Sequence, residues 1–338
     1  MSEEVARRAI DLLAAAPYEG MKHIAFFGGE PLMNIPILEF ILAYGREVIG
    51  DKTKLGFMVS TNGTKLTETV TDLLSRHHVS IQVSVDGTRE LQNRLRPLRG
   101  NGDSFNAVAR NLDSARRIAG NIHGRATVTN LCPDALDLTV QLMSLGFDSV
   151  SLQPVHGSRT LELDDTQMTQ FVEGYRIMAR RGLSRKVSWL KGCVERVARR
   201  ARAEQFCGAG LRGLTVATDG NFYVCHRLIP LPEFRVGDVR DGVNTEKLVD
   251  IFKGKQGVDV SLVCTSCMFR HMCGGGCLAE NFLENGDIRE PWTMRCLLTK
   301  GVCQAALDAY LDQHYCNESL ETAPDAEVAA AGGGDDPG

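Results

Sequence analysis

The segment CTSCMFRHMCGGGC, residues 264–277, places four cysteines two, five and three residues apart, and a fifth, Cys296, follows within MRC. Two further cysteines, Cys207 and Cys225, stand on either side of a predicted hairpin upstream. Thiolates are soft ligands that bind transition metals and iron–sulfur clusters. The spacing therefore predicts that the C-terminal part of the chain is organised around two iron–sulfur clusters.

Zinc is the alternative occupant of these thiols, because zinc sites also use two-residue cysteine spacings. Zinc ligands usually come as two tight pairs, whereas here a run of four thiols is followed by a remote fifth. The glycines at 274–276 also remove bulk beside the ligands. These features favour iron–sulfur clusters and leave zinc open.

The composition is that of a globular protein whose cysteines are reduced. The 338 residues leave room for two domains, and the net charge of −4 gives no basis for binding nucleic acid or an anionic membrane. Eleven cysteines is an odd number, eight of them lie between Cys207 and Cys303, and the first residues form an amphipathic segment rather than a secretory signal. We therefore expect metal ligation, a cytoplasmic location, and neither nucleic acid nor membrane as a partner.

Apolar segments alternate with amphipathic ones in the first half of the chain, which predicts an α/β fold with a parallel sheet or barrel. Strands are expected at 23–27, 54–60, 79–85, 124–130 and 148–153. Downstream the pattern predicts two helices within 164–205, a hairpin at 214–225, a short helix from Asn244 and a last helix at 297–311. The earlier helices are expected at about 2–16, 34–49, from 67, 104–119 and 134–145.

Three of the turns that follow predicted strands carry groups suited to a small polar ligand. Gly28-Gly29-Glu30 lets a ligand approach the backbone beside a carboxylate, an arrangement that can accept the hydrogens of an ammonium group. The turns at 60–63 (STNG) and 84–87 (SVDG) offer hydroxyl, amide and carboxylate groups. Each turn alone is ordinary turn chemistry, so the prediction depends on all three lying on one rim of the fold.

GGEP, TNG and SVDG, followed by the seven-cysteine tail, resemble the radical S-adenosylmethionine enzymes that carry a SPASM domain, over about residues 1–315. The resemblance implies a partial (β/α)6 barrel that lacks its first strand, followed by a cysteine-rich SPASM domain with a β-hairpin. The implied divisions are a radical core at 1–185, a helical bridge at 186–206, the SPASM domain at 207–316 and a disordered tail at 317–338.

Within this group the cysteine surroundings look most like the maturases of the SCIFF or ranthipeptide type, which install thioether crosslinks in ribosomally made peptides. The anaerobic sulfatase-maturating enzymes, which form formylglycine, are the near relatives and the alternative. They are expected to carry an aspartate directly after the cysteine that is Cys225 here, and this chain has His226. A third interpretation, from a different class, is a non-catalytic protein that binds iron–sulfur clusters or zinc.

The resemblance also assigns ligands, although it leaves the catalytic residues unknown. The fourth ligand of the first auxiliary cluster is either Cys193 or a thiolate of the substrate, and the remaining cysteines, Cys132, Cys303 and Cys316, are expected to be buried apolar residues. The loop before Arg96 departs from the family, since Gln92-Asn93 replaces its His-Asp. The assigned contacts are Gly28, Gly29, Glu30, Ser60, Asn62, Ser84, Asp86 and Arg96 for S-adenosylmethionine, Cys207, Cys225 and Cys277 for one auxiliary [4Fe-4S] cluster, and Cys264, Cys267, Cys273 and Cys296 for the other.

The family's catalytic [4Fe-4S] cluster is held by a Cys-x3-Cys-x2-Cys motif after the first barrel strand, and the first cysteine of this sequence is Cys132. We expect that the sequence is a truncated form, inactive as written, whose full-length version carries this cluster; the alternative is a protein that does not cleave the cofactor. The resemblance implies a ribosomally made precursor peptide or protein as substrate, and an electron donor such as flavodoxin or ferredoxin.

Overall fold

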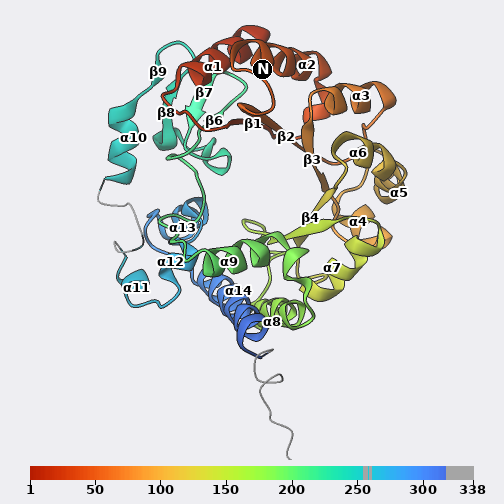
Figure 1. Ribbon diagram of the computed structural model, residues 1–338, viewed down its shortest axis with the longest axis vertical. Helices are drawn as coiled ribbons and strands as arrows, with labels where there is room; N and C mark the ends of the chain where they lie inside the picture. Colours follow the sequence, from red (N-terminus) through yellow and green to blue (C-terminus); the bar gives the residue numbers. More distant parts are fainter. Residues whose placement is uncertain (254–257, 259–260, 317–338) are drawn as a thin grey trace, which may run out of the picture.

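The computed structural model describes residues 1–253, 258 and 261–316, and these form a ring of two unequal parts (Figure 1). The larger part is a five-stranded parallel sheet in the order β1-β2-β3-β4-β5. All five predicted strands are confirmed, with ends within two residues of those expected. They are β1 (Lys22–Phe26), β2 (Leu55–Thr61), β3 (Val79–Ser84), β4 (His123–Val128) and β5 (Ser149–Pro154).

Helices connect these strands, and Figure 1 shows them on the outside of the sheet. Side-chain oxygens cap several of them, as Ser2 does for α1 and Thr67 for α3, because the first backbone N–H groups of a helix have no partner within it. The helices of this part are α1 (Glu3–Ala15), the 3-10 turn η1 (Pro31–Met33), α2 (Ile35–Val48), α3 (Glu68–Arg76), α4 (Arg89–Leu95), α5 (Ser104–Arg110), α6 (Leu112–Ala119) and α7 (Ala135–Ser144).

The helix expected over 104–119 is in fact two helices, α5 and α6, which meet at Asn111. The Nδ2 of Asn111 donates a hydrogen bond of 2.8 Å to the carbonyl oxygen of Gly63, in the turn after β2. A tertiary hydrogen bond thus competes with the helical continuation at this residue, and the hydrophobic periodicity of the sequence does not report it.

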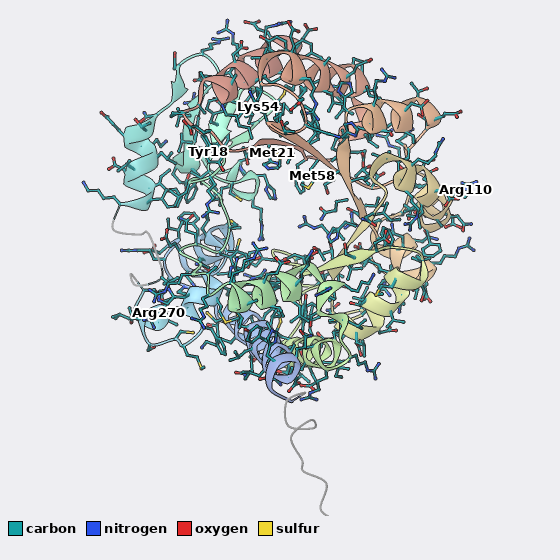
Figure 2. The ribbon with its side chains drawn as sticks, viewed as in Figure 1. Tyr18, Met21, Lys54, Met58, Arg110 and Arg270 are labelled. Carbon is teal, nitrogen blue, oxygen red and sulfur yellow. The ribbon has the colours of Figure 1, made fainter. Side chains whose placement is uncertain are left out.

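The five-stranded sheet has one apolar and one polar face. Along β2, β3, β4 and β5, buried residues alternate with half-buried or exposed ones. The buried set packs under the helices, as the pleat requires when one face of a strand meets a core. The other set is largely polar and turns toward the inside of the ring, where Figure 2 shows Met58 of β2. Most parallel sheets are covered on both faces, so a polar inner face indicates a surface kept for a ligand.

Residues beyond the fifth strand close the ring. Helix α14 packs against α8 and α9, and the predicted hairpin, β6 with β7, is confirmed but belongs to a four-stranded antiparallel sheet whose β8 and β9 the sequence did not indicate. The elements are α8 (Asp165–Arg180), η2 (Leu183–Arg185), α9 (Ser188–Ala198), β6 (Thr215–Val216), β7 (Asn221–Tyr223), η3 (His226–Leu228), η4 (Pro232–Phe234), β8 (Arg235–Asp238), β9 (Gly242–Val243), α10 (Thr245–Phe252), α11 (Leu262–Thr265), α12 (Arg270–Cys273), α13 (Leu278–Asn285), α14 (Thr293–Leu311) and η5 (Asp312–Cys316).

Helix α1 joins the two parts at the top of Figure 1. It packs against α2, while its Val5 and Ala9 contact the second hydrophobic core, which is built around Phe222, Val236 and Phe252. The tail predicted to be disordered, 317–338, lies outside the described residues. Among the residues described, no helix has the length and apolar character needed to cross a bilayer.

Candidate functional site

The glycine turn after β1 leaves open space beside its backbone. Gly28 has φ of +144°, a conformation that a side chain would strain, and a Cβ placed on Gly28 or Gly29 would meet no atom within 4 Å. A ligand can therefore approach the backbone here, as the sequence predicted. The open space beside Gly28 and Gly29 is consistent with the predicted binding of S-adenosylmethionine at this turn.

The Glu30 carboxylate ties this turn to the end of β2. It accepts hydrogen bonds from the backbone N–H of Leu32 (3.1 Å), the hydroxyl of Thr61 (2.7 Å) and the backbone N–H of Asn62 (2.7 Å). Two of the three predicted turns are thus held on one rim by a single carboxylate. Since two of these bonds use Oε1 and one uses Oε2, one acceptor position remains for an ammonium group.

The third turn is organised by Asp86, whose side chain is 3% exposed. Its Oδ2 lies 2.5 Å from Nε of Arg96, and its Oδ1 accepts the backbone N–H of Thr127 (2.8 Å). Arg96 also donates to the hydroxyl of Thr127 (3.0 Å). Asp86 therefore positions the Arg96 guanidinium, so that Arg96, 34% exposed, presents the charge that a ligand carboxylate could meet.

The two residues that depart from the family pattern hold the same loop in place. Gln92 is 2% exposed and accepts the backbone N–H of Asp86 (2.8 Å). Asn93 donates to Asp103 (3.0 Å) and accepts the hydroxyl of Ser104 (3.0 Å). Gln92 and Asn93 are thus uncharged side chains whose hydrogen bonds fix the loop.

Two other assigned residues have local partners as well. The Ser60 hydroxyl donates to Gln82 on β3 (3.2 Å), and the Asn62 side chain accepts the backbone N–H of Thr64 (3.0 Å). Ser84 lies on the polar inner face at the end of β3, beside Arg125 of β4. The structure thus brings all three predicted turns to one rim.

Electrostatic interactions link thiols within each of the two sets of cysteines that the resemblance implies. Burial raises the pKa of the Cys225 thiol, and Cys277 and Cys207 raise it further. Burial raises the pKa of Cys207 too, with an additional contribution from Cys277. These three thiols therefore lie within electrostatic reach of one another.

The second group contains the other four thiols. Burial raises the pKa of Cys273, which Cys264 and Cys267 raise further. Burial raises the pKa of Cys296 to about 11, with further contributions from Cys273 and Cys264. Because these thiols are protonated at neutral pH without metal, binding of a cluster would release protons.

Neither group is shaped for a single ion. Across residues 1–253, 258 and 261–316, no three side chains of Cys, His, Asp and Glu converge closely enough to hold one metal ion. A [4Fe-4S] cluster takes one thiolate on each iron and so holds its sulfur ligands farther apart than one tetrahedral ion does.

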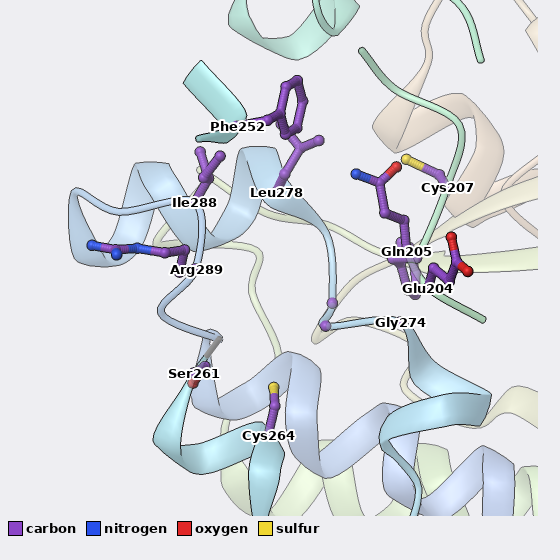
Figure 3. Close-up of a pocket in the computed structure, with 13 residues that line it drawn as sticks. Glu204, Gln205, Cys207, Phe252, Ser261, Cys264, Gly274, Leu278, Ile288 and Arg289 are labelled. Atoms are coloured by element: carbon purple, nitrogen blue, oxygen red, sulfur yellow. The ribbon is translucent and has the colours of Figure 1, made fainter. Parts of the chain in front are cut away.

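A cavity of about 50 Å³ lies between the two groups. Figure 3 shows Cys207 and Cys264 on opposite sides of it, with Gly274 between them. Gly274 has φ of +78°, and a Cβ there would lie 2.1 Å from the carbonyl carbon of Gln205. Only glycine permits this approach of the cysteine loop to the backbone that leads into Cys207.

Cys193 does not join the first group. Its thiol is fully buried and hydrogen-bonded to that of Cys303, which is also fully buried, so that the pair connects α9 to α14. Cys303 is a buried residue as predicted, Cys132 is half-buried, and the side chain of Cys316 lies outside the described residues. The burial of Cys193 beside Cys303 therefore gives no support to Cys193 as the fourth ligand.

The two halves of the site meet at the residues after Cys225. The His226 ring packs on Phe27, directly before the glycine turn, with ring centroids 4.5 Å apart. Arg227 points its Nη1 toward the Cys277 sulfur at 3.8 Å and donates to Glu280 at 2.7 Å. The predicted S-adenosylmethionine pocket and first cluster site are therefore adjacent.

A charged network behind this junction was missed by sequence reasoning. Glu280 is 1% exposed and accepts one hydrogen bond from Arg227 (2.7 Å) and two from Arg295 (2.6 Å each). Arg295 is buried as well. Arg227 also contacts His156 Nδ1 (2.7 Å), on the segment after β5. The spacing of these residues carries no periodic or motif signal, because they come from four separate segments.

Comparisons with known proteins agree with this geometry. Residues 1–131 match the Radical SAM superfamily. The chain is 26% identical over 302 residues to the serine-type anaerobic sulfatase-maturating enzyme of Klebsiella pneumoniae, covering 82% of this chain and 73% of the relative. It is 22% identical over 283 residues to the cysteine-type anaerobic sulfatase-maturating enzyme of Clostridium perfringens (strain ATCC 13124), covering 75% of this chain and 73% of that relative.

The fold also has solved counterparts. The structure of native anSMEcpe with bound AdoMet and Kp18Cys peptide superposes with a TM-score of 0.76 at 18% identity, covering 93% of this chain and 90% of that one. At this identity the likeness concerns the fold.

Proposed function

Because residues 1–131 form a radical S-adenosylmethionine domain, homologous to that of the anaerobic sulfatase-maturating enzymes, we propose that this chain belongs to a maturase that modifies a ribosomally made peptide. The modification we favour is a thioether crosslink between a cysteine sulfur and a carbon of the same peptide. The feature that supports the proposal is a set of three cysteines, Cys207, Cys225 and Cys277, whose thiols interact electrostatically. A group of three leaves one iron of a [4Fe-4S] cluster without a protein thiolate.

An iron with a free coordination position suits a thiol substrate. Metal coordination lowers the pKa of a thiol until it is deprotonated. We infer that a cysteine of the peptide binds at the position beside Cys207, Cys225 and Cys277. Arg227, at 3.8 Å from the Cys277 sulfur, would stabilise the negative charge of such a cluster.

The residues of the rim would hold S-adenosylmethionine, which supplies a carbon radical when it is reductively cleaved. Gly28 and Gly29 leave space beside the backbone, Glu30 keeps one acceptor position, and Arg96 is fixed by Asp86. The packing of His226 on Phe27 would close the space between this pocket and the first cluster. The chain's own residues thus bind and orient the reactants.

The catalytic cluster does not fit the residues present, since the printed sequence contains no Cys-x3-Cys-x2-Cys motif. We therefore expect the 338-residue chain on its own not to cleave S-adenosylmethionine. Electrons for the two auxiliary clusters would come from a small protein such as flavodoxin or ferredoxin, and the cytoplasm would supply the reducing conditions.

Sulfatase maturation is the second candidate, and the relatives with that activity in their names support it equally. The two activities differ in the product. A thioether replaces one S–H and one C–H bond by a C–S bond, whereas formylglycine formation at cysteine removes the sulfur and leaves an aldehyde.

Mass spectrometry of peptides coexpressed with a form of the protein that supplies the three-cysteine motif tests the proposal. We expect cysteine-containing peptides that lose two hydrogens and one alkylatable thiol and keep their sulfur. Peptides that react with hydrazide reagents and have lost sulfur would assign sulfatase maturation instead. If the peptides stay unmodified while S-adenosylmethionine is cleaved in the same cells, both thioether formation and sulfatase maturation are refuted.

Metal analysis of the anaerobically reconstituted 338-residue chain tests the competing interpretation as a binding protein. Two [4Fe-4S] clusters require about eight irons and eight sulfides per chain. Zinc without sulfide would instead support a zinc-binding protein and refute the proposed clusters.

A further inference from the structure

Arg125 occupies the middle of β4, on the polar inner face of the parallel sheet. In the register of the sheet it lies between Ser84 of β3 and Ser151 of β5. Serines on both sides keep the surrounding surface polar and leave room for a long side chain. The arginine is half-buried, so its charge lies at the inside of the ring rather than in bulk water.

The charge of Arg125 is not compensated by the described part of the chain. No carboxylate of residues 1–253, 258 and 261–316 forms an ion pair or hydrogen bond with it. Burial lowers the pKa of Arg125, and the charges of Arg96 and Arg227 lower it further. Arg96 and Arg227 therefore lie within electrostatic range of Arg125, and Arg96 also contacts Thr127, two residues further along β4.

The carboxylates near these arginines are already occupied. Asp86 pairs with Arg96 at 2.5 Å, and Glu280 pairs with both Arg227 and Arg295. Asp86 and Glu280 are 3% and 1% exposed, and neither can turn toward Arg125 without leaving its own arginine partner unpaired. The region around Arg96, Arg125 and Arg227 therefore has an excess of positive charge that no ion pair within the described part of the chain compensates.

We propose that Arg125 binds a carboxylate of the peptide substrate, either an aspartate or glutamate side chain or a free C terminus, and so selects acidic substrates. The assignment of a peptide as ligand follows from the proposed function. A guanidinium offers a planar pair of N–H donors that match the two oxygens of a carboxylate, which makes it the side chain suited to this recognition.

Arg96, which Asp86 holds beside the cofactor rim, is the arginine assigned to S-adenosylmethionine, and this assignment leaves Arg125 for the peptide. Arg96 contacts Thr127 beside the cofactor rim, whereas Arg227 contacts Cys277. Arg125 lies on the same face of β4 as Thr127, the residue that Arg96 contacts, and opposite Ser84 of β3. We infer that a peptide whose cysteine binds at the first cluster site would pass Arg125.

Selection of a random peptide library on the immobilised, cluster-reconstituted full chain tests the inference without turnover. The chain is compared with Arg125→Gln, with Arg125→Lys, and with Arg110→Gln as a matched loss of charge on the outer surface, where Figure 2 shows Arg110. Equilibrium dialysis of S-adenosylmethionine with each variant separates the two carboxylate sources.

We expect the unaltered chain and Arg110→Gln to enrich peptides with an acidic residue at one position. Arg125→Gln should bind the selected peptide about tenfold to a hundredfold more weakly, the size of one charge-assisted contact, and should bind its Asp→Asn or Glu→Gln counterpart with unchanged affinity. Arg125→Lys keeps the charge but not the planar donors, so it should retain a weaker acidic preference. Arg125→Gln should be at least as thermally stable as the parent, because it relieves repulsion.

Two results would overturn the inference. One is a set of selected peptides without an acidic position, or with the same acidic position on Arg125→Gln. The other is a loss of S-adenosylmethionine affinity in Arg125→Gln while peptide binding stays intact. That result would show that Arg125 binds the cofactor and not the peptide. If Arg125→Gln does not fold, Arg125→Lys decides through the same two measurements. Peptide binding is independent of catalysis, so failure here and failure of the maturase activity remain distinct.

Discussion

At the scale of single residues, the buried carboxylates of this protein position cations. Asp86 and Glu280 each hold an arginine whose guanidinium faces the candidate site. Removing one partner of a buried ion pair costs more than the pair contributes, because the other charge remains in a poorly solvated place. The two carboxylates therefore matter for stability and for the site together.

Replacing Asp86 by asparagine should destabilise the protein. The amide still has an oxygen for the backbone N–H of Thr127, but its NH2 group would face the Nε–H donor of Arg96. We expect a loss of about 3 kcal/mol in the free energy of unfolding, a value at the lower end for a buried pair because Arg96 is partly exposed. Chemical unfolding of the reconstituted protein measures it.

Asp148→Asn is the matched control for this change. Asp148 also contacts one arginine, Arg116 (3.1 Å), and one backbone N–H, that of Ile122 (2.9 Å), but its side chain is 34% exposed. An exposed pair of this kind contributes at most about 1 kcal/mol. Equal losses for the two variants would show that burial of Asp86 is not what makes it important.

At the scale of elements, the cysteine loop is held by backbone contacts as much as by its own sequence. The backbone N–H of Ala203 donates to the carbonyl of His271 (2.6 Å), and Arg196 of α9 donates to the carbonyl of Met272 (2.7 Å). These bonds fix helix α12, which ends at Cys273. Gly274 then allows the chain to pass against residue 205.

Gly274→Ala should disrupt the cysteine loop more than Gly275→Ala, although both glycines have positive φ (+78° and +87°). Alanine at Gly275 meets no atom within 4 Å and costs only the conformational strain, about 1–2 kcal/mol. Alanine at Gly274 adds a clash with the backbone of Gln205 and displaces the loop that connects the two thiol groups. The iron content after reconstitution should therefore fall in Gly274→Ala and stay near the parent value in Gly275→Ala. Equal iron contents would contradict this account.

At the scale of the whole molecule, the two parts of the ring have different means of support. The parallel sheet and its helices share a large apolar core, whereas the antiparallel sheet and the cysteine loops pack around a much smaller one. Small cores generally need cross-links or metals to be stable. The proposed clusters would connect segments that are far apart in the sequence, such as Cys207 with Cys277.

Removing the clusters by anaerobic oxidation and chelation should loosen the second part and spare the first. Hydrogen exchange followed by mass spectrometry is expected to speed up in peptides from 207–252 and 262–292, while β2, β3 and β4 keep their protection. If exchange stays unchanged throughout, the clusters do not stabilise the fold. If it speeds up everywhere, the two parts form one cooperative unit.

The sequence predicted the strands of the sheet because local patterns carry them. A segment such as 79–84 alternates buried and partly exposed residues and is bounded by turn residues, and its identity as a strand needs no information from elsewhere. The spacing of the cysteines predicted metal ligation, and their division into two sets of ligands, which the family resemblance implies, stays a prediction. Strands β8 and β9 were missed because four and two residues carry too little periodicity.

The sequence by itself determined the kind of fold, the turns that carry glycine and acidic residues, and which cysteines can act as ligands, because periodicity, turn chemistry and ligand spacing are local properties. Only the tertiary structure decided what those residues do. It showed that Asp86 holds Arg96, that Gln92 supports the backbone of Asp86, and that Cys193 pairs with Cys303. It also placed Arg125 among like charges. Such relations join segments distant in the chain, and their energies depend on burial, which no local pattern records.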